Sequence, residues 1–236
     1  MIAELFEERG DSVNKILKDL IGKVVHLELS GKQLINGLIV DLGGDLLVLY
    51  NGKDYLYLPI LHVKSFNAMN QADIDFAMPT DKDIPGISVD ETVSLRKVLT
   101  TAKGMFVEIY VSGNKPLHGY ITSIMNNYFA FYSPIHKTMY IMLSHLKWLI
   151  PYMNQERPYN LSNQALPLQP NSLSLARTFE VQIEKLIDEL VVFNVYENDS
   201  VCGKVNRIEG NIIEIQTARN NLSYLNLHHL KLVYKV

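Results

Sequence analysis

The sequence is poor in the residues that cross-link or anchor a chain. It has one cysteine, Cys202, among 236 residues. A single thiol cannot form an intrachain disulfide, and it excludes a zinc site built on thiolates. No run approaches the roughly 18 consecutive apolar residues of a membrane helix, so we expect no membrane contact. The start, MIAELFEERGDS, lacks the basic and apolar regions of a signal peptide, which predicts synthesis in the cytoplasm without secretion.

Sequence motifs of the common enzyme classes are also missing. There is no Gly-x-Ser-x-Gly, no P-loop, no dinucleotide glycine fingerprint and no His-Glu-x-x-His. The close acidic pair Asp73 and Asp75 lies in a predicted linker. We therefore expect a protein that is not an enzyme, with no catalytic residues and no cofactor. The net charge of −3 argues against a generally basic surface for nucleic acid.

The main feature of the sequence is an internal repeat. The segments YLPILHVK, YIMLSHLK and YLNLHHLK begin at Tyr57, Tyr140 and Tyr224. They share the pattern Tyr, aliphatic, any, aliphatic, any, His, aliphatic, Lys and recur at a spacing of about 84 residues, which indicates three structural units. The glycines that precede these segments at matching positions are Gly37, Gly119 and Gly203.

Alternating apolar residues flank each glycine, and this period of two is typical of strands with one buried face. A glycine inside such a strand commonly marks a bend. Each strand set follows a stretch with helical spacing; in the first of these, Val13, Ile16, Leu17 and Leu20 form one apolar stripe. In the aromatic strand at 128–132 we expect Phe129 and Phe131 to face the core. We expect Tyr128 and Tyr132 to face outward.

These patterns predict a mainly β chain of three tandem five-stranded barrels, Sm-like or SH3-like, each preceded by a short α-helix. Polar and proline-rich stretches predict the linkers between them. The expected boundaries are 1–66 for the first helix and barrel, 67–87 for a linker, 88–149 for the second unit, 150–172 for a linker and 173–236 for the third unit. We call the three units the first, second and third repeats.

The motif Tyr-x-x-aliphatic-x-His-aliphatic-Lys resembles the amino-terminal region of spore coat protein B of Bacillus, with LHVKSF at 61–66 as its nearest counterpart. The resemblance covers the three repeats. It implies a structural protein of sporulation, assembled on the spore surface through multivalent contacts with other coat or scaffold proteins or with itself. The order of Gly37, Asp45 and Asn51 loosely resembles Sm proteins, so the alternative is an Sm-like protein that binds single-stranded RNA.

The candidate interaction positions are the repeated histidines and lysines: His62, Lys64, His145, Lys147, His229 and Lys231. The histidines could converge on a metal or an RNA base. The interpretation we favour is that each is hydrogen-bonded within its own unit, so we predict no metal site. The lysines could contact phosphate, but we favour positions on edge strands, where they discourage edge-to-edge pairing. The repeated tyrosines could stack on bases, although packing is the simpler role.

Overall fold

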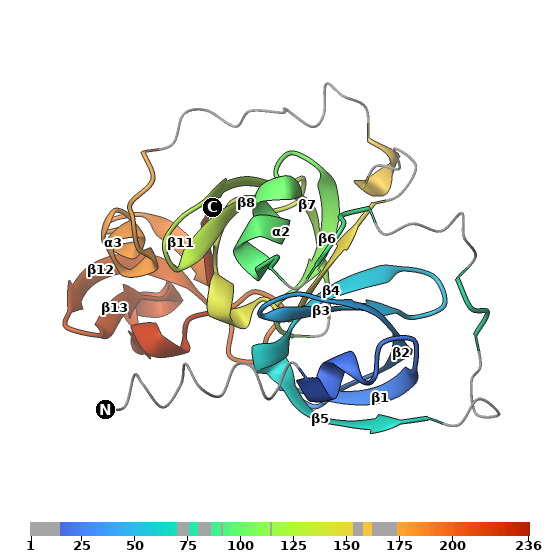
Figure 1. Ribbon diagram of the computed structural model, residues 1–236. Helices are drawn as coiled ribbons and strands as arrows, with labels where there is room; N and C mark the ends of the chain where they lie inside the picture. Colours follow the sequence, from blue (N-terminus) through green and yellow to red (C-terminus); the bar gives the residue numbers. More distant parts are fainter. Residues whose placement is uncertain are drawn as a thin grey trace, which may run out of the picture. The chain divides into compact units, whose positions relative to one another are not determined.

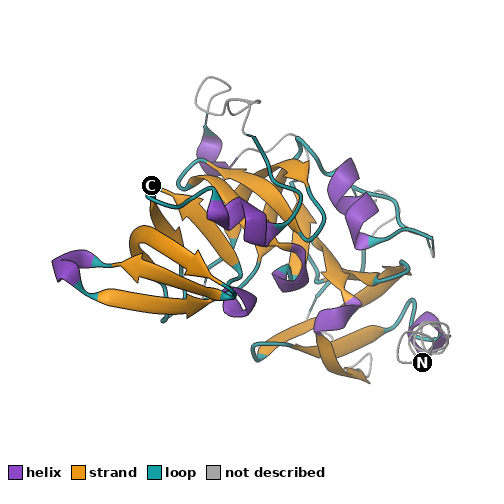
Figure 2. Cartoon of the chain, turned by 90° about the vertical axis from the view of Figure 1, so that its left-hand side faces the viewer, coloured by secondary structure: helices purple, strands orange, loops and turns teal. Residues whose placement is uncertain are grey.

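A computed structural model describes residues 15–69, 76–79, 86–90, 92–113, 115–152, 158–161 and 174–236. Most of the two predicted linkers, together with Val13, Asp73 and Asp75, lies outside these ranges. The chain is mainly β, and its helices are short (Figure 2). It divides into two compact units, Met1–Thr101 with Lys147–Pro151, and Ala102–Leu146 with Tyr152–Val236. Within the described residues, no helix is long and apolar enough to cross a bilayer.

Among the described residues of the first compact unit, α-helix occurs at residues 15–18 and in α2 (Leu95–Thr101). Its strands are all antiparallel and follow the order β10-β4-β3-β2-β1-β5. Figure 1 labels the strands β1 to β5 of this unit. Their bounds are β1 Val24–Leu29, β2 Gln33–Leu42, β3 Leu46–Tyr50, β4 Tyr55–Pro59, β5 Val63–Ala68 and β10 Trp148–Pro151. A 3-10 turn, η1 (Ile60–His62), joins β4 to β5.

The second compact unit contains the helix α3 (Phe179–Glu184). Its strands are again antiparallel, in the order β14-β13-β12-β11-β15-β9-β8-β7-β6. Their bounds are β6 Phe106–Tyr110, β7 Leu117–Ile124, β8 Tyr128–Ser133, β9 Lys137–Met142, β11 Leu190–Phe193, β12 Val201–Glu209, β13 Ile212–Gln216, β14 Leu222–Asn226 and β15 Leu232–Lys235. The 3-10 turns in its described residues are η3 Leu143–His145, η4 Pro158–Asn160, η5 Ala218–Asn220 and η6 Leu227–His229.

The repeated glycines lie where two strands approach most closely. A side chain on Gly37 would meet the carbonyl oxygen of Tyr50, and Gly119 and Gly203 face the carbonyls of Tyr132 and Gln216 in the same way. Downstream of each glycine the pairing of the second strand with the third shifts by one residue. Such bulges bend a strand and increase its twist. The predicted bend at the glycines therefore has a steric cause that is common to all three strand pairs.

Each compact unit contains an apolar core built from the inward residues of its alternating strands. One lies in the first compact unit and is built from the helical residue Leu17 and inward residues of β1 to β4, such as Val25, Leu27 and Leu49. The other lies in the second unit and packs Phe179 and Ile183 of α3 against residues of β8, β9 and β11 to β15. The prediction that Phe129 and Phe131 are core residues is confirmed, because both are fully buried.

Two predictions about side-chain direction were wrong. Tyr128 and Tyr132 were expected to face outward, but both are buried, since a second layer covers that face of β8. The Tyr128 hydroxyl donates to the carbonyl of Ala176 at 2.8 Å, and Tyr132 packs on Tyr120. In the first helical segment Leu17 is buried as predicted, but Ile16 is 59% exposed.

The turn before the third strand of a repeat receives the helix of the following repeat. The Asp45 Oδ1 atom accepts a hydrogen bond from the Leu95 amide at 2.6 Å, where α2 begins. The Asn127 Oδ1 atom accepts from the Phe179 amide at 2.8 Å, where α3 begins. Both side chains thereby satisfy an amide that the helix itself leaves without a partner.

We expect Asp45→Ala to lower the free energy of unfolding by about 1 kcal/mol, because the Leu95 amide loses its acceptor. Urea unfolding followed by circular dichroism measures this loss. Asn211→Ala is the matched control: Asn211 occupies the corresponding turn of the third repeat, its side chain is exposed, and residues 212–236 contain no α-helix. The control should change stability by less than about 0.5 kcal/mol, and equal losses would contradict the capping role of Asp45.

Candidate functional site

The structure holds each repeated histidine in a 3-10 turn, which the sequence pattern did not predict. His62 ends η1 and is 5% exposed. Its Nδ1 atom lies 2.9 Å from Ser30 Oγ, and its carbonyl accepts from the Ser30 amide at 2.8 Å. His145 is half-buried and His229 is exposed. In the described part of the chain no three His, Cys, Asp or Glu side chains form a group that could hold a metal ion.

Two of the repeated lysines are held by carboxylates of their own compact unit. Lys64 forms an ion pair with Glu28, and its hydrogen bond and charge lower the pKa of that carboxyl. Lys231 forms an ion pair with Glu197, while its backbone amide donates to Asn194 Oδ1 at 2.9 Å. Lys147 lies beside Gly31. Two lysines thus have a local role within their unit.

The prediction that the three lysines mark edge strands fits one position and is wrong for the others. Lys64 lies in β5, which pairs only with β1 among the described strands. The strands after Lys147 and Lys231 are not free edges: β10 pairs with β4, and β15 pairs with both β9 and β11. The sequence could not reveal this, because the partner strands lie about one repeat earlier in the chain.

The repeated tyrosines differ sharply in exposure. Tyr57 is fully buried; its hydroxyl donates to the carbonyl of Ile87 at 2.5 Å and accepts from the Ile87 amide at 2.8 Å. Burial raises the pKa of Tyr57 to about 12. Tyr140 is 6% exposed, but Tyr224 is 59% exposed. A packing role therefore fits the first two tyrosines, while the third stands on an open surface.

That open surface is the outward face of β13 and β14, which we call the β13–β14 face. Besides Tyr224 it carries Ile212 and Leu222, which are 43% and 48% exposed. At the positions that match Ile212, the first two repeats have Leu46 and Tyr128, both fully buried. The same face of the sheet is therefore covered in the first two repeats and uncovered in the third.

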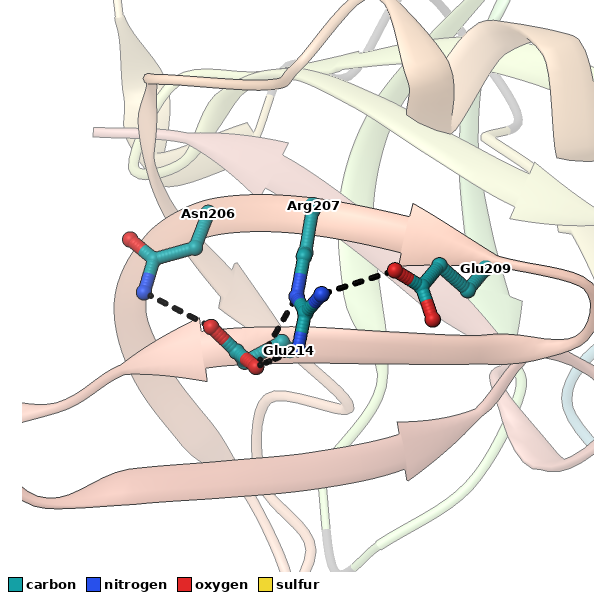
Figure 3. A network of polar contacts seen from close by, with 4 residues as sticks. All are labelled: Asn206, Arg207, Glu209 and Glu214. Carbon is teal, nitrogen blue, oxygen red and sulfur yellow. Dashed lines mark hydrogen bonds and ion pairs between the residues drawn. The ribbon is translucent and has the colours of Figure 1, made fainter.

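A hollow of about 290 Å³ lies on the β13–β14 face, lined by Arg207, Glu209, Ile212, Glu214 and Tyr224. Arg207 bridges two strands (Figure 3): its Nη1 atom lies 2.7 Å from Glu209 Oε1, and its Nη2 atom lies 3.0 Å from Glu214 Oε2. Asn206 Nδ2 donates to the other oxygen of Glu214 at 3.3 Å. The hydrogen bond from Arg207, followed by that from Asn206, lowers the pKa of Glu214.

This arrangement suits contact with another protein chain. It combines exposed aliphatic and aromatic side chains with an arginine whose charge is already matched, the mixture that protein interfaces favour. The polar groups of the hollow satisfy one another, so covering them would leave no carboxylate without a partner. This site was not predicted from the sequence. An alignment of the three repeats could have indicated it, because Glu214 is charged where the first two repeats have the apolar residues Val48 and Ala130.

Comparisons with known proteins place the chain among Bacillus relatives. A family model described as the YwrJ third domain matches residues 178–233. The protein YwrJ of Bacillus subtilis is 35% identical over 222 residues, which cover 93% of this chain and 99% of that protein. Spore coat protein B of Bacillus subtilis is 24% identical over 143 residues, which cover 61% of this chain and 35% of that protein. The resemblance to spore coat protein B is thus confirmed as a distant similarity.

Proposed function

The chain belongs to the YwrJ family, and on that premise we propose that it is a structural protein of the spore coat that acts by binding other proteins and not by catalysis. The observation that carries the proposal is the uncovered β13–β14 face, where Ile212, Leu222 and Tyr224 are exposed. At the positions that match Ile212 and Tyr224 the other two repeats have buried residues. The distant similarity to spore coat protein B supports a coat setting.

The proposal includes three tandem barrels as the building units. In the first repeat the strands pair in the order β5-β1-β2-β3-β4, and in the third in the order β15-β11-β12-β13-β14. Both orders place the last strand beside the first, as a five-stranded SH3-like or Sm-like barrel requires. Several such units in one chain provide several contact surfaces, and linked weak contacts raise the overall affinity.

The partners in this proposal are other coat or scaffold proteins and further copies of the chain. RNA is not among them, because Lys64 and Lys231 are already paired with Glu28 and Glu197. A phosphate would have to displace those carboxylates. No cofactor and no catalytic step are proposed, since Arg207 and Glu214 of the hollow neutralise each other.

A localisation experiment tests the coat role. The chain is fused to a fluorescent protein and produced in sporulating Bacillus subtilis, with the fluorescent protein alone as control. We expect a fluorescent shell around the developing spore, and recovery of the fusion in coat extracts of purified spores. Fluorescence spread evenly through the mother cell, as in the control, would contradict the proposal.

A second measurement distinguishes the Sm-like alternative. The purified chain is titrated with a fluorescent uridine-rich single strand at low and then moderate salt. We expect no binding. Tight binding that weakens steeply with salt would indicate phosphate contacts and would favour the RNA hypothesis.

A further inference from the structure

The chain forms the same strand junction twice. The closing strand of the second repeat, β10, pairs antiparallel with β4, where Leu149 lies opposite Tyr57. The closing strand of the third repeat, β15, pairs antiparallel with β9, where Val233 lies opposite Tyr140. The tyrosines occupy matching positions, and each partner lies four residues after the histidine of its motif. One register thus serves both junctions.

The helix contacts recur together with the strand pairing. At the first junction the Gly44 amide donates to the carbonyl of Val93 at 2.9 Å, and at the second the Asn126 amide donates to the carbonyl of Arg177 at 3.0 Å. These bonds lie next to the caps formed by Asp45 and Asn127. Each junction therefore combines two contacts: a strand of the following repeat extends the sheet, and the start of a helix is hydrogen-bonded to the turn before the third strand.

One half of this junction is left open in the third repeat. The fourth strand, β14, has β13 as its single neighbour among the described strands. Tyr224 matches Tyr57 and Tyr140 but is 59% exposed, against 0% and 6%. The Asn211 side chain, which matches the capping Asp45 and Asn127, is exposed as well. In the third repeat the edge of β14, the β13–β14 face and the turn at Asn211 are therefore all open to a partner.

The complementary half is left open in the first repeat. The closing strand β5 has β1 as its single neighbour among the described strands. Phe66 lies four residues after His62, the position of Leu149 and Val233; those two are fully buried, whereas Phe66 is half-buried. Ile16 is 59% exposed, although the matching helix residues Val98 and Gln182 are 0% and 2% exposed.

We propose that copies of this chain associate head to tail, with β5 of one copy pairing antiparallel with β14 of the next. In the shared register Phe66 of one copy lies opposite Tyr224 of the other, and Ile16 packs onto the β13–β14 face. The occupant of the open face is thus a second copy, because the chain already carries both halves of a junction that it forms twice. The inference deepens the proposed function, on which its coat setting rests, by naming one partner.

Charges at the joint are compatible with this pairing. Lysine on an edge strand normally discourages added strands. However, Lys64 is paired with Glu28, just as Lys231 is paired with Glu197 beside the β9·β15 junction. On the receiving face Arg207 is paired with both Glu209 and Glu214, so these three side chains carry a net charge of −1. The β5 surface and the β13–β14 face are different surfaces, so two joined copies still have one free β5 surface and one free β13–β14 face. Further copies can therefore add until a ring closes or a filament grows.

Sedimentation velocity of the full chain across a micromolar concentration range tests the inference. We expect the wild type to form assemblies larger than its monomer mass of 26.9 kDa. Tyr224→Lys blocks the receiving face, and Ile16→Lys blocks the inserted one. Both residues are exposed, so either variant should remain folded and become monomeric. Leu34→Lys is the matched control, because Leu34 is 63% exposed and lies outside β5 and β14; it should assemble like the wild type.

Mixing the two blocked variants gives the decisive result. Tyr224→Lys retains an intact β5 surface and Ile16→Lys retains an intact β14 surface, so the mixture should contain complexes of two chains and no larger assemblies. A monomeric wild type, assembly unaffected by either variant, or a mixture that remains monomeric would each overturn the inference. Sedimentation tests the purified chain, whereas localisation tests the coat role in cells. If the chain reaches the coat but stays monomeric when purified, the head-to-tail inference is contradicted and the proposed function is not.

Discussion

Replacing Gly119 by alanine is expected to lower the free energy of unfolding by about 3 kcal/mol, the upper part of the range for overpacking a well-packed site. The added methyl group would overlap the carbonyl oxygen of Tyr132 and touch the ring of Phe131. The obstacle is the backbone of β8 at Tyr132, which pairs with Tyr120 next to Gly119, so it cannot move away without breaking the pairing of β7 with β8 at this point. Urea unfolding of the full chain, followed by circular dichroism, measures the loss.

Gly210→Ala is the control for this prediction. Gly210 has a positive φ of 56° and nothing within 4 Å of an added Cβ. Alanine there meets only the intrinsic cost of the left-handed conformation, about 1 kcal/mol. A loss at Gly119 no larger than at Gly210 would contradict the steric role of Gly119, because it would show that β7 and β8 move apart there at little cost in free energy.

The sequence was most informative where local patterns decide the structure. Alternation predicted a mainly β chain, and the glycines marked bends that the structure explains by contact with a neighbouring carbonyl. The repeat itself followed from the matching Tyr, His and Lys positions. These features depend on residues close together in the chain, or on comparison of one repeat with another, and both are visible without coordinates.

Sequence reasoning failed where the answer depends on what covers a surface. The pattern of β8 gives Tyr128 and Tyr132 as the outward residues of a two-faced strand, yet both are buried because a second layer lies on that face. The reverse error occurred at Ile16, which has helical core spacing but no covering layer among the described residues. Alternation reports which side chains share a face, and it does not report whether the second face is packed.

The candidate site was hidden for a related reason. Neither Arg207 nor Glu214 belongs to the repeated motif, and a single arginine and a single glutamate in adjacent strands carry no signal by themselves. Their meaning comes from position: Glu214 replaces residues that are buried in the first two repeats, and its neighbours Ile212 and Tyr224 are exposed. The third repeat therefore exposes the sheet face that is buried at a junction in each of the other two repeats.

Truncating Phe179 to alanine is expected to lower the free energy of unfolding by about 4 kcal/mol, the usual cost of removing a buried phenylalanine ring. Phe179 begins α3 and is fully buried, with its ring centroid 6.0 Å from that of Tyr128. Its loss would leave a cavity between α3 and the covered face of β8, the layer that makes Tyr128 a core residue. Urea unfolding at neutral pH measures the change.

Val181→Ala is the matched control, because it removes an apolar side chain from the same helix at a position that is 45% exposed. It should change stability by less than about 0.5 kcal/mol, since alanine also has the higher helix propensity. Similar small losses from both variants would mean that α3 rests loosely on β8. The burial of Tyr128 would then have another cause. The contact of α3 with β8 could then not be a stabilising part of the repeated junction.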